Sequence, residues 1–125
     1  MKYEEMKLLD EELGKLVTMY GIEEGQKPSM EFFSRATDCV GFYDEISNEI
    51  WVFDGLNLTE AKKTVRHEFA HFLLWLRHPN KEQSKKEERI ANMMERTPLK
   101  FLPVANGVQK TLDKFRGSER VGESP

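Results

Sequence analysis

The chain has 125 residues, 38% of them hydrophobic and 33% charged, with a formal net charge of −3 and a single cysteine. This length fits one domain with one modest core. The mixed charges lack the basic stripe of an electrostatic nucleic-acid binder, and a single cysteine excludes an internal disulfide. Residues 1–10 are too charged for a signal peptide, and no apolar run approaches the roughly 20 residues that span a bilayer. We therefore expect a cytoplasmic protein without membrane or direct nucleic-acid contacts.

The first half of the chain predicts one helix and three short strands. Residues 3–20 carry apolar side chains at helical spacing, and Gly21 ends this amphipathic helix. A strand is predicted over 29–34, after a turn. Residues 39–43 and 50–53 are two β-rich runs joined by an Asp/Ser/Asn-rich loop, which is typical of a hairpin.

Two residues of this hairpin have alternative interpretations. Cys39 is expected to be a small buried residue, and the alternative is a thiolate that caps a metal ion. Tyr43 is expected to pack against the sheet, and the alternative is a hydroxyl that donates a hydrogen bond to an oxyanion.

Two helices are predicted in the second half. The first has Thr59 as its N-cap and Glu60 in its first turn, and runs to about Leu76, where His78-Pro79 ends it. The second covers residues 87–96. Its inward-facing residues are expected to be Ile90, Ala91, Met93 and Met94.

The first of these helices contains the segment His67-Glu68-Phe69-Ala70-His71. Residues four apart lie on one helical face, so the two imidazoles can meet one Zn²⁺ at about 2.1 Å each. Glu68 then lies beside the metal, where it can take a proton from a bound water. The competing interpretation is a pair of helix histidines that are satisfied by hydrogen bonds.

A catalytic zinc site needs three protein ligands and an open position. His78 does not fit the three-histidine metzincin pattern, because Leu74 and Arg77 occupy the positions that require glycine and histidine. We expect His78 to be a cation at the helix end.

Glu88 is the preferred third ligand. It has the small Ala91 one turn later, which allows close helix approach, and Asn92 at i+4, which is expected to hydrogen-bond the outer nitrogen of a ligand histidine. Glu87 remains an alternative ligand, and both glutamates can also be solvated surface charges.

The order of these elements, with Gly41-Phe42-Tyr43-Asp44, the His-Glu-x-x-His helix and Glu88-x-x-Ala91-Asn92, resembles the gluzincin peptidases. Within that class it is most similar to the ImmA/IrrE-type regulatory peptidases and to the archaeal minigluzincins, over roughly residues 1–103. ImmA/IrrE proteins commonly have glycine in place of Ala70 and an acidic residue in place of Ile90. We expect no helix-turn-helix domain within these 125 residues.

The resemblance implies an α+β minimal gluzincin (zincin-like) fold with an N-terminal helix, a small three-stranded sheet, an active-site helix and a glutamate helix. It makes His67, His71 and Glu88 the zinc ligands and Glu68 the general base. It also implies an edge strand that pairs with extended peptide substrate, for which Ile50–Phe53 is the candidate.

The expected function is zinc-dependent peptide-bond hydrolysis by a metallopeptidase domain of residues 1–104. Residues 105–125 are expected to be either disordered or inhibitory. The resemblance implies the inhibitory alternative, because minigluzincins are zymogens whose C-terminal segment occupies the cleft. The alternatives are an ImmA/IrrE-like peptidase that acts on a DNA-binding repressor, and a non-catalytic zinc-binding module. The expected partner is a peptide or protein substrate; the oligomeric state is open, a dimer included.

Overall fold

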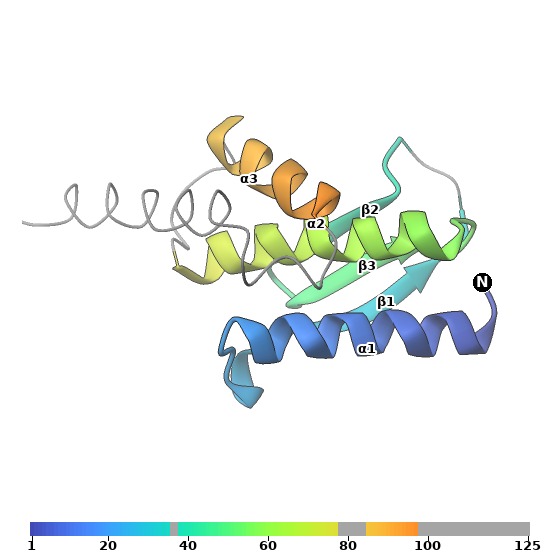
Figure 1. The fold of residues 1–125 in the computed structure, drawn as a ribbon, viewed down its shortest axis with the longest axis horizontal. Coiled ribbons are helices and arrows are strands. Elements are labelled where there is room, and N and C mark those ends of the chain that lie inside the picture. The colour runs from blue at the N-terminus through green and yellow to red at the C-terminus, as the bar shows by residue number, and fades with distance from the viewer. Residues whose placement is uncertain (36–37, 78–84, 98–125) are drawn as a thin grey trace, which may run out of the picture.

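The described part of the chain folds into three helices and one small mixed sheet, all on one hydrophobic core (Figure 1). The structure, a computed structural model, describes residues 1–35, 38–77 and 85–97. The elements are α1 (Tyr3–Met19), the 3-10 turn η1 (Glu24–Gln26), β1 (Ser29–Phe33), β2 (Gly41–Asp44), β3 (Glu49–Phe53), α2 (Leu58–Arg77) and α3 (Lys85–Arg96). The predicted α+β class and the order of its elements are confirmed.

The elements begin and end for local reasons. Gly21, with φ +65°, ends α1, because glycine adopts the left-handed conformation without steric cost. The N-cap of α2 is Asn57, whose side-chain oxygen accepts the backbone N–H of Glu60 at 2.9 Å. The predicted N-cap, Thr59, is wrong because the helix already begins at Leu58, which puts Asn57 at the capping position.

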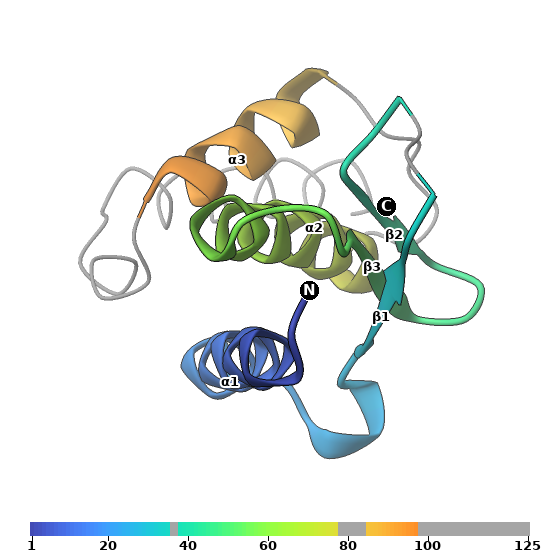
Figure 2. The ribbon, with the colours of Figure 1, turned by 90° about the vertical axis from the view of Figure 1, so that its right-hand side faces the viewer.

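The sheet has the order β1-β3-β2. β3 pairs in parallel with β1 and antiparallel with β2, so the predicted hairpin of β2 and β3 is confirmed. The prediction that Ile50–Phe53 is an edge strand is wrong: both sides of β3 are paired, and Ile50 and Val52 are fully buried. The edge strand nearest α2 and α3 is β2 (Figure 2).

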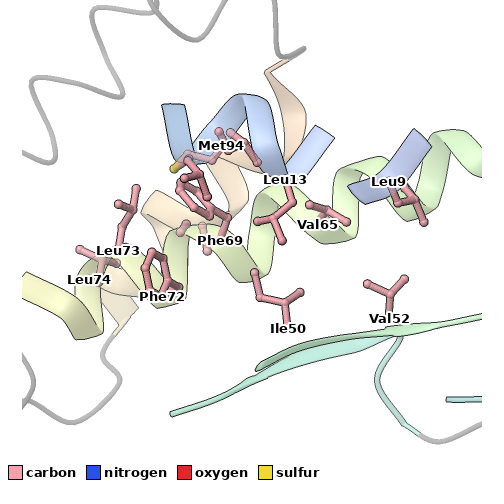
Figure 3. Packing of buried hydrophobic residues seen from close by; sticks show 14 of the residues in the cluster. Leu9, Leu13, Ile50, Val52, Val65, Phe69, Phe72, Leu73, Leu74 and Met94 are labelled. Atoms are coloured by element: carbon pink, nitrogen blue, oxygen red, sulfur yellow. The ribbon is translucent and has the colours of Figure 1, made fainter. Parts of the chain in front are cut away.

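The core lies between the sheet and the helices, with α2 at its centre (Figure 3). Ile50 and Val52 of β3 face α2, whose Val65, Phe69 and Phe72 are fully buried. Leucines of α1 and Met94 of α3 close the core from the helical side. Side chains on most of the circumference of α2 are buried, as its wide apolar face predicts.

All three helices lie on one side of the sheet (Figure 2), and within the described residues no helix covers the opposite face. No helix of the described residues is long and apolar enough to cross a membrane. His78, the domain boundary at 104 and the segment 105–125 lie outside the described residues, so the expectations for them remain predictions.

Candidate metal centre

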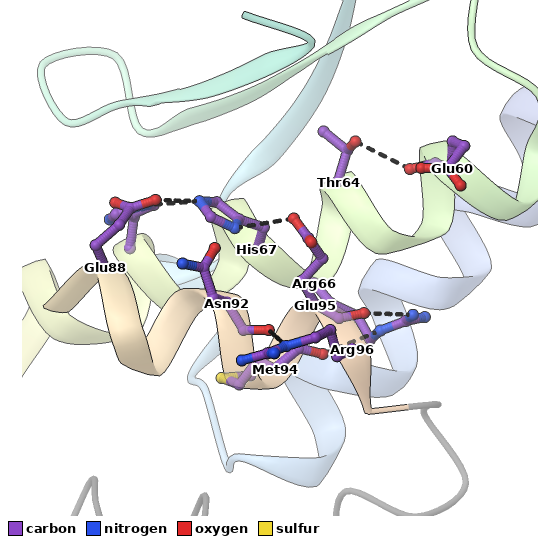
Figure 4. A network of polar contacts seen from close by, with 10 residues as sticks. Glu60, Thr64, Arg66, His67, Glu88, Asn92, Met94, Glu95 and Arg96 are labelled. Atoms are coloured by element: carbon purple, nitrogen blue, oxygen red, sulfur yellow. Dashed lines mark hydrogen bonds and ion pairs between the residues drawn. The ribbon is translucent and has the colours of Figure 1, made fainter. Parts of the chain in front are cut away.

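The two histidines of α2 turn their Nε2 atoms toward each other. The helical spacing of four residues places His67 and His71 one turn apart, and their Nε2 atoms are 3.3 Å from each other. Glu88 of α3 lies across both rings: one carboxylate oxygen is 3.0 Å from Nε2 of His67, and the other is 3.3 Å from Nε2 of His71. The predicted ligand set therefore meets at one point between α2 and α3. Figure 4 shows the contact there between His67 of α2 and Glu88 of α3.

These separations fit a small metal ion. In a tetrahedral site with ligands at about 2.1 Å, two ligand atoms are about 3.4 Å apart, and the three contacts are 3.0 to 3.3 Å. Two ring nitrogens that face each other at this distance also need a cation or a shared proton between their lone pairs. His67, His71 and Glu88 are thus positioned to bind a metal ion.

The outer nitrogens of both histidines face carboxylates of α3. Nδ1 of His71 lies 3.0 Å from Glu87, and Nδ1 of His67 lies 3.1 Å from Glu95. The first contact is a hydrogen bond; the second is an ion-pair contact, because the buried Nδ1 of His67 has no well-aligned acceptor. When Nδ1 of His71 donates its proton to Glu87, the Nε2 lone pair of that ring is available for a metal ion.

The prediction that Asn92 supports a ligand histidine is wrong, because Glu87 and Glu95 occupy both outer nitrogens. Within the described residues, the side chain of Asn92 forms no hydrogen bond. Helical spacing could have indicated Glu95, which lies seven residues after Glu88 and therefore on the same face of α3. Glu87 is 13% exposed and Glu88 is 41% exposed, so the metal position opens to solvent on the side of Glu88.

Glu68 is a buried acid beside this cluster. Burial raises its pKa to about 7, and the carboxylates of Glu88 and Glu95 add to the rise, whereas His71 opposes it. For His71, burial lowers the pKa, but the hydrogen bond that its Nδ1 donates to Glu87 and the nearby carboxylates outweigh burial, so its pKa is raised overall. Within the described residues, Glu68 forms no hydrogen bond or ion pair.

The edge strand β2 approaches α2 at Gly41. A Cβ on Gly41 would lie 2.4 Å from Cγ2 of Thr64, 2.9 Å from the carbonyl oxygen of Trp51 and 3.6 Å from Cγ of Glu68. Only glycine allows this approach, because real Cβ atoms essentially never come within 3.0 Å of another heavy atom. The start of β2 is therefore held directly beside Glu68.

The outer edge of β2 offers backbone groups for pairing. The N–H of Phe53 donates to the carbonyl of Val40 at 2.8 Å, so Val40 and Phe42 direct their backbone groups toward β3. By alternation, the N–H and C=O groups of Gly41 and Tyr43 point away from the sheet. No described segment pairs with this edge.

Tyr43 packs as predicted. Its ring contacts Phe72 edge-on at a centroid distance of 5.8 Å, and its hydroxyl donates to the side chain of Asn48 at 2.7 Å. This hydrogen bond already engages the hydroxyl that the alternative role, oxyanion stabilisation, would need. Cys39, by contrast, is exposed, and its predicted burial is wrong because it lies in the bend before β2 and not in the strand ladder.

A buried ion pair, which the sequence analysis did not predict, connects the helix that carries the metal motif to its neighbours. Arg66 lies 2.9 Å from Glu12 of α1, and both side chains are buried. The same guanidinium donates to the carbonyls of Met94 at 3.2 Å and Glu95 at 2.9 Å, at the end of α3 (Figure 4). Arg66 thus connects the metal-motif helix to α1 and to the turn that carries Glu95. The available signal was Glu12 itself, which lies within the Leu9, Leu13 and Leu16 stripe of α1.

The comparisons with known proteins add no family to this geometry. No protein-family model, no curated protein and no solved structure matches the chain.

Proposed function

We propose that the protein is a gluzincin-type zinc metallopeptidase that hydrolyses peptide bonds in extended segments. The observation that carries the proposal is the convergence of His67, His71 and Glu88 on one point, with the buried acid Glu68 next to it. Two imidazoles and one carboxylate are the ligand set of a well-known type of catalytic zinc site with an open fourth position.

Zinc would be held by the Nε2 atoms of the two histidines and by Glu88. When bound, it supplies a Lewis acid for a carbonyl oxygen and lowers the pKa of water toward neutrality. Glu87, which accepts a hydrogen bond from Nδ1 of His71, keeps that imidazole in the ligating tautomer, and Glu95 lies within 3.1 Å of Nδ1 of His67. The exposure of Glu88 leaves an approach for substrate from solvent.

Glu68 is the proposed general base. A carboxyl group with a pKa of about 7 is matched to proton transfer near neutral pH, where both of its protonation states are populated. Its carboxylate takes the proton of the attacking water and then delivers it to the amine nitrogen that leaves when the peptide C–N bond breaks. Glu95 and Glu88, which raise the pKa, favour the protonated form that makes this delivery.

The edge of β2 would align the substrate. The outward N–H and C=O groups of Gly41 and Tyr43 can pair with an extended peptide, as in β-strand addition. Because Gly41 lies against Glu68, a peptide paired there passes directly in front of the base. This assigns to β2 the role that the sequence interpretation gave to Ile50–Phe53.

The alternative is a non-catalytic zinc-binding module, and burial of Glu68 argues against it. Burial that raises the pKa of Glu68 to about 7 disfavours its charged form, a free-energy cost that a purely structural site has no reason to retain.

Metal analysis combined with peptide-library cleavage tests the proposal. We expect bound zinc and cleavage in the wild type, retained zinc without cleavage in Glu68→Gln, and loss of zinc in Glu88→Ala. Glu11→Ala, which removes an exposed carboxylate from α1, is the matched control and should change neither zinc content nor cleavage. Stoichiometric zinc without cleavage of any peptide would refute the peptidase assignment.

A further inference from the structure

The face of the sheet that points away from the helices carries aromatic rings and carboxylates. On this outer face, Phe42 stacks on Trp51 with centroids 5.8 Å apart and planes 9° apart. Phe33 contacts Phe42 at 5.8 Å and Phe53 at 5.7 Å. Of these rings, Phe42 is the most accessible, at 41% exposed.

The register fixes which residues share this face. Gly41 and Tyr43 contact α2, so Phe42 and Asp44 point to the opposite side. Phe42 lies opposite Trp51, and Asp44 lies opposite Glu49. Glu31 adds a third carboxylate beside Trp51, and none of the three strands contains a lysine or arginine. The outer face is therefore both aromatic and acidic.

Two features of this face favour a cation. Asp44, whose Oδ1 accepts the backbone N–H of Ile46 at 3.0 Å, lies directly opposite Glu49; like charges opposite each other destabilise a sheet, and a cation near them would relieve the repulsion. The faces of Phe42 and Trp51 attract an ammonium or guanidinium group through their negative quadrupole. A lysine or arginine side chain satisfies both features, because its stem can lie along a ring while its charged head reaches a carboxylate.

We propose that the outer face selects substrate by binding a lysine or arginine side chain of an extended peptide that is paired to β2. Residues opposite each other in neighbouring strands share a face, so the cationic residue is the one opposite Phe42. Its chain neighbour lies opposite Gly41 and faces Glu68. Peptides with a basic residue next to the bond that faces Glu68 are the preferred class.

This inference takes one premise from the proposed function, namely that an extended peptide pairs with the edge of β2. Charge complementarity supports a basic partner independently. Within residues 29–54, which contain the sheet, the sequence has six acidic residues and one arginine: Glu31, Asp38, Asp44, Glu45, Glu49 and Asp54 against Arg35.

Peptide binding to the full chain with Glu68→Gln tests the inference without turnover. Fluorescence anisotropy compares a labelled Thr/Ala-rich peptide with one central arginine and the same peptide with citrulline, which keeps the shape and loses the charge. We expect citrulline to weaken binding about three- to tenfold, and added salt to reduce the difference. Equal affinities for the two peptides would overturn the inference.

Variants of the face give the second arm. Phe42→Leu keeps an apolar side chain but removes the ring, and Asp44→Asn removes one carboxylate; each should reduce the preference for arginine. The matched control is Leu8→Ala, which truncates a side chain of α1 that is 40% exposed, and it should leave the preference unchanged. A preference that survives both β2 substitutions would contradict the assignment of the site to this face.

The remaining outcomes separate this inference from the proposed function. Cleavage by the zinc-loaded wild type without any arginine preference would overturn the inference and leave the hydrolysis intact. Arginine-selective binding without cleavage would support the face and refute hydrolysis. A third outcome is a dimer in sedimentation that Phe42→Leu dissociates, together with equal binding of the two peptides. This outcome would show that the outer face binds a second copy of the chain, and it would overturn the inference.

Discussion

Glu68 is next to His67 in the sequence, yet its surroundings differ from those of the histidines. The histidines are partly exposed and have carboxylate partners, whereas Glu68 is buried and forms no hydrogen bond within the described residues. Glu68→Gln keeps its shape and removes its basicity. We expect hydrolysis to fall by about 10²- to 10⁴-fold while zinc content stays at the wild-type level. Turnover of a peptide identified in the library, measured beside zinc analysis, checks this, and unchanged turnover would exclude Glu68 as the base.

Burial of Glu68 also predicts a pH dependence of folding stability in the metal-free protein. Its pKa rises from 4.5 to about 7 on folding, so the folded state favours the protonated form. The favourable contribution is complete below pH 4.5 and is lost as the pH rises to about 7. A pKa that rises from 4.5 to about 7 corresponds to at most about 3.4 kcal/mol.

Glu68→Gln, which cannot ionise, should therefore be more stable than the wild type above pH 7, and this advantage should vanish below pH 4.5. Urea unfolding with a chelator present, across that pH range, measures the difference. The control is Glu11→Gln, an exposed glutamate of α1 whose replacement should give no such trend. A constant difference between wild type and Glu68→Gln at all pH values would contradict burial of an ionisable Glu68.

At the scale of elements, the position of β2 depends on the absence of one side chain. Gly41→Ala would place its Cβ against Thr64 and the carbonyl of Trp51. We expect a loss of about 1–3 kcal/mol in the free energy of unfolding, and weaker peptide turnover because the edge strand moves away from Glu68. Chemical denaturation and kinetics check both effects. In the double variant Gly41→Ala/Thr64→Ser, the serine removes Cγ2 and keeps the hydroxyl, so part of the lost stability should return. Fully additive changes in the free energy of unfolding would show that the new Cβ does not contact Thr64.

The position of α3 relative to α2 depends on Arg66. Glu12→Ala would leave the guanidinium buried without its carboxylate, which costs about 3–5 kcal/mol. We expect a further effect on the site, because Arg66 also binds the carbonyls of the turn that carries Glu95. Zinc affinity, measured by chelator competition below the unfolding temperature, should fall in Arg66→Met/Glu12→Met, which removes both charges and keeps the volume. Leu16→Ala, a core truncation in α1, should lower stability and leave the affinity unchanged; equal affinity losses in both variants would refute a positioning role.

At the scale of the molecule, the sequence predicted whatever depends on local pattern. Helical periodicity gave α1, α2 and α3 close to their observed bounds, and the spacing of His67 and His71 on one face follows from helix geometry alone. Strand order does not follow from local pattern, because a hairpin and a third strand can pair in several ways, and β3 therefore appeared as an edge. Glu95, Glu12 and Arg66 were missed for the same reason: their partners lie on other elements.

The position of the site relative to the core of the whole molecule also predicts how much the metal ion contributes to the free energy of unfolding. The core of α1, α2, α3 and the sheet is continuous without the site, whereas His67, His71 and Glu88 lie at its surface. The metal-free chain should therefore fold, unlike a zinc module that is unfolded without its ion. Zinc at 1,000 times its Kd should add about 4 kcal/mol to the free energy of unfolding. Thermal unfolding with and without a chelator measures this gain, and Mg²⁺ should give little of it, because Mg²⁺ prefers oxygen ligands and two of the three ligands are imidazoles. Glu88→Ala should lose most of this zinc-dependent stabilisation but should still fold without zinc, because the carboxylate of Glu88 binds the metal ion and does not pack in the core. A metal-free chain that is unfolded by circular dichroism would instead identify a structural zinc site.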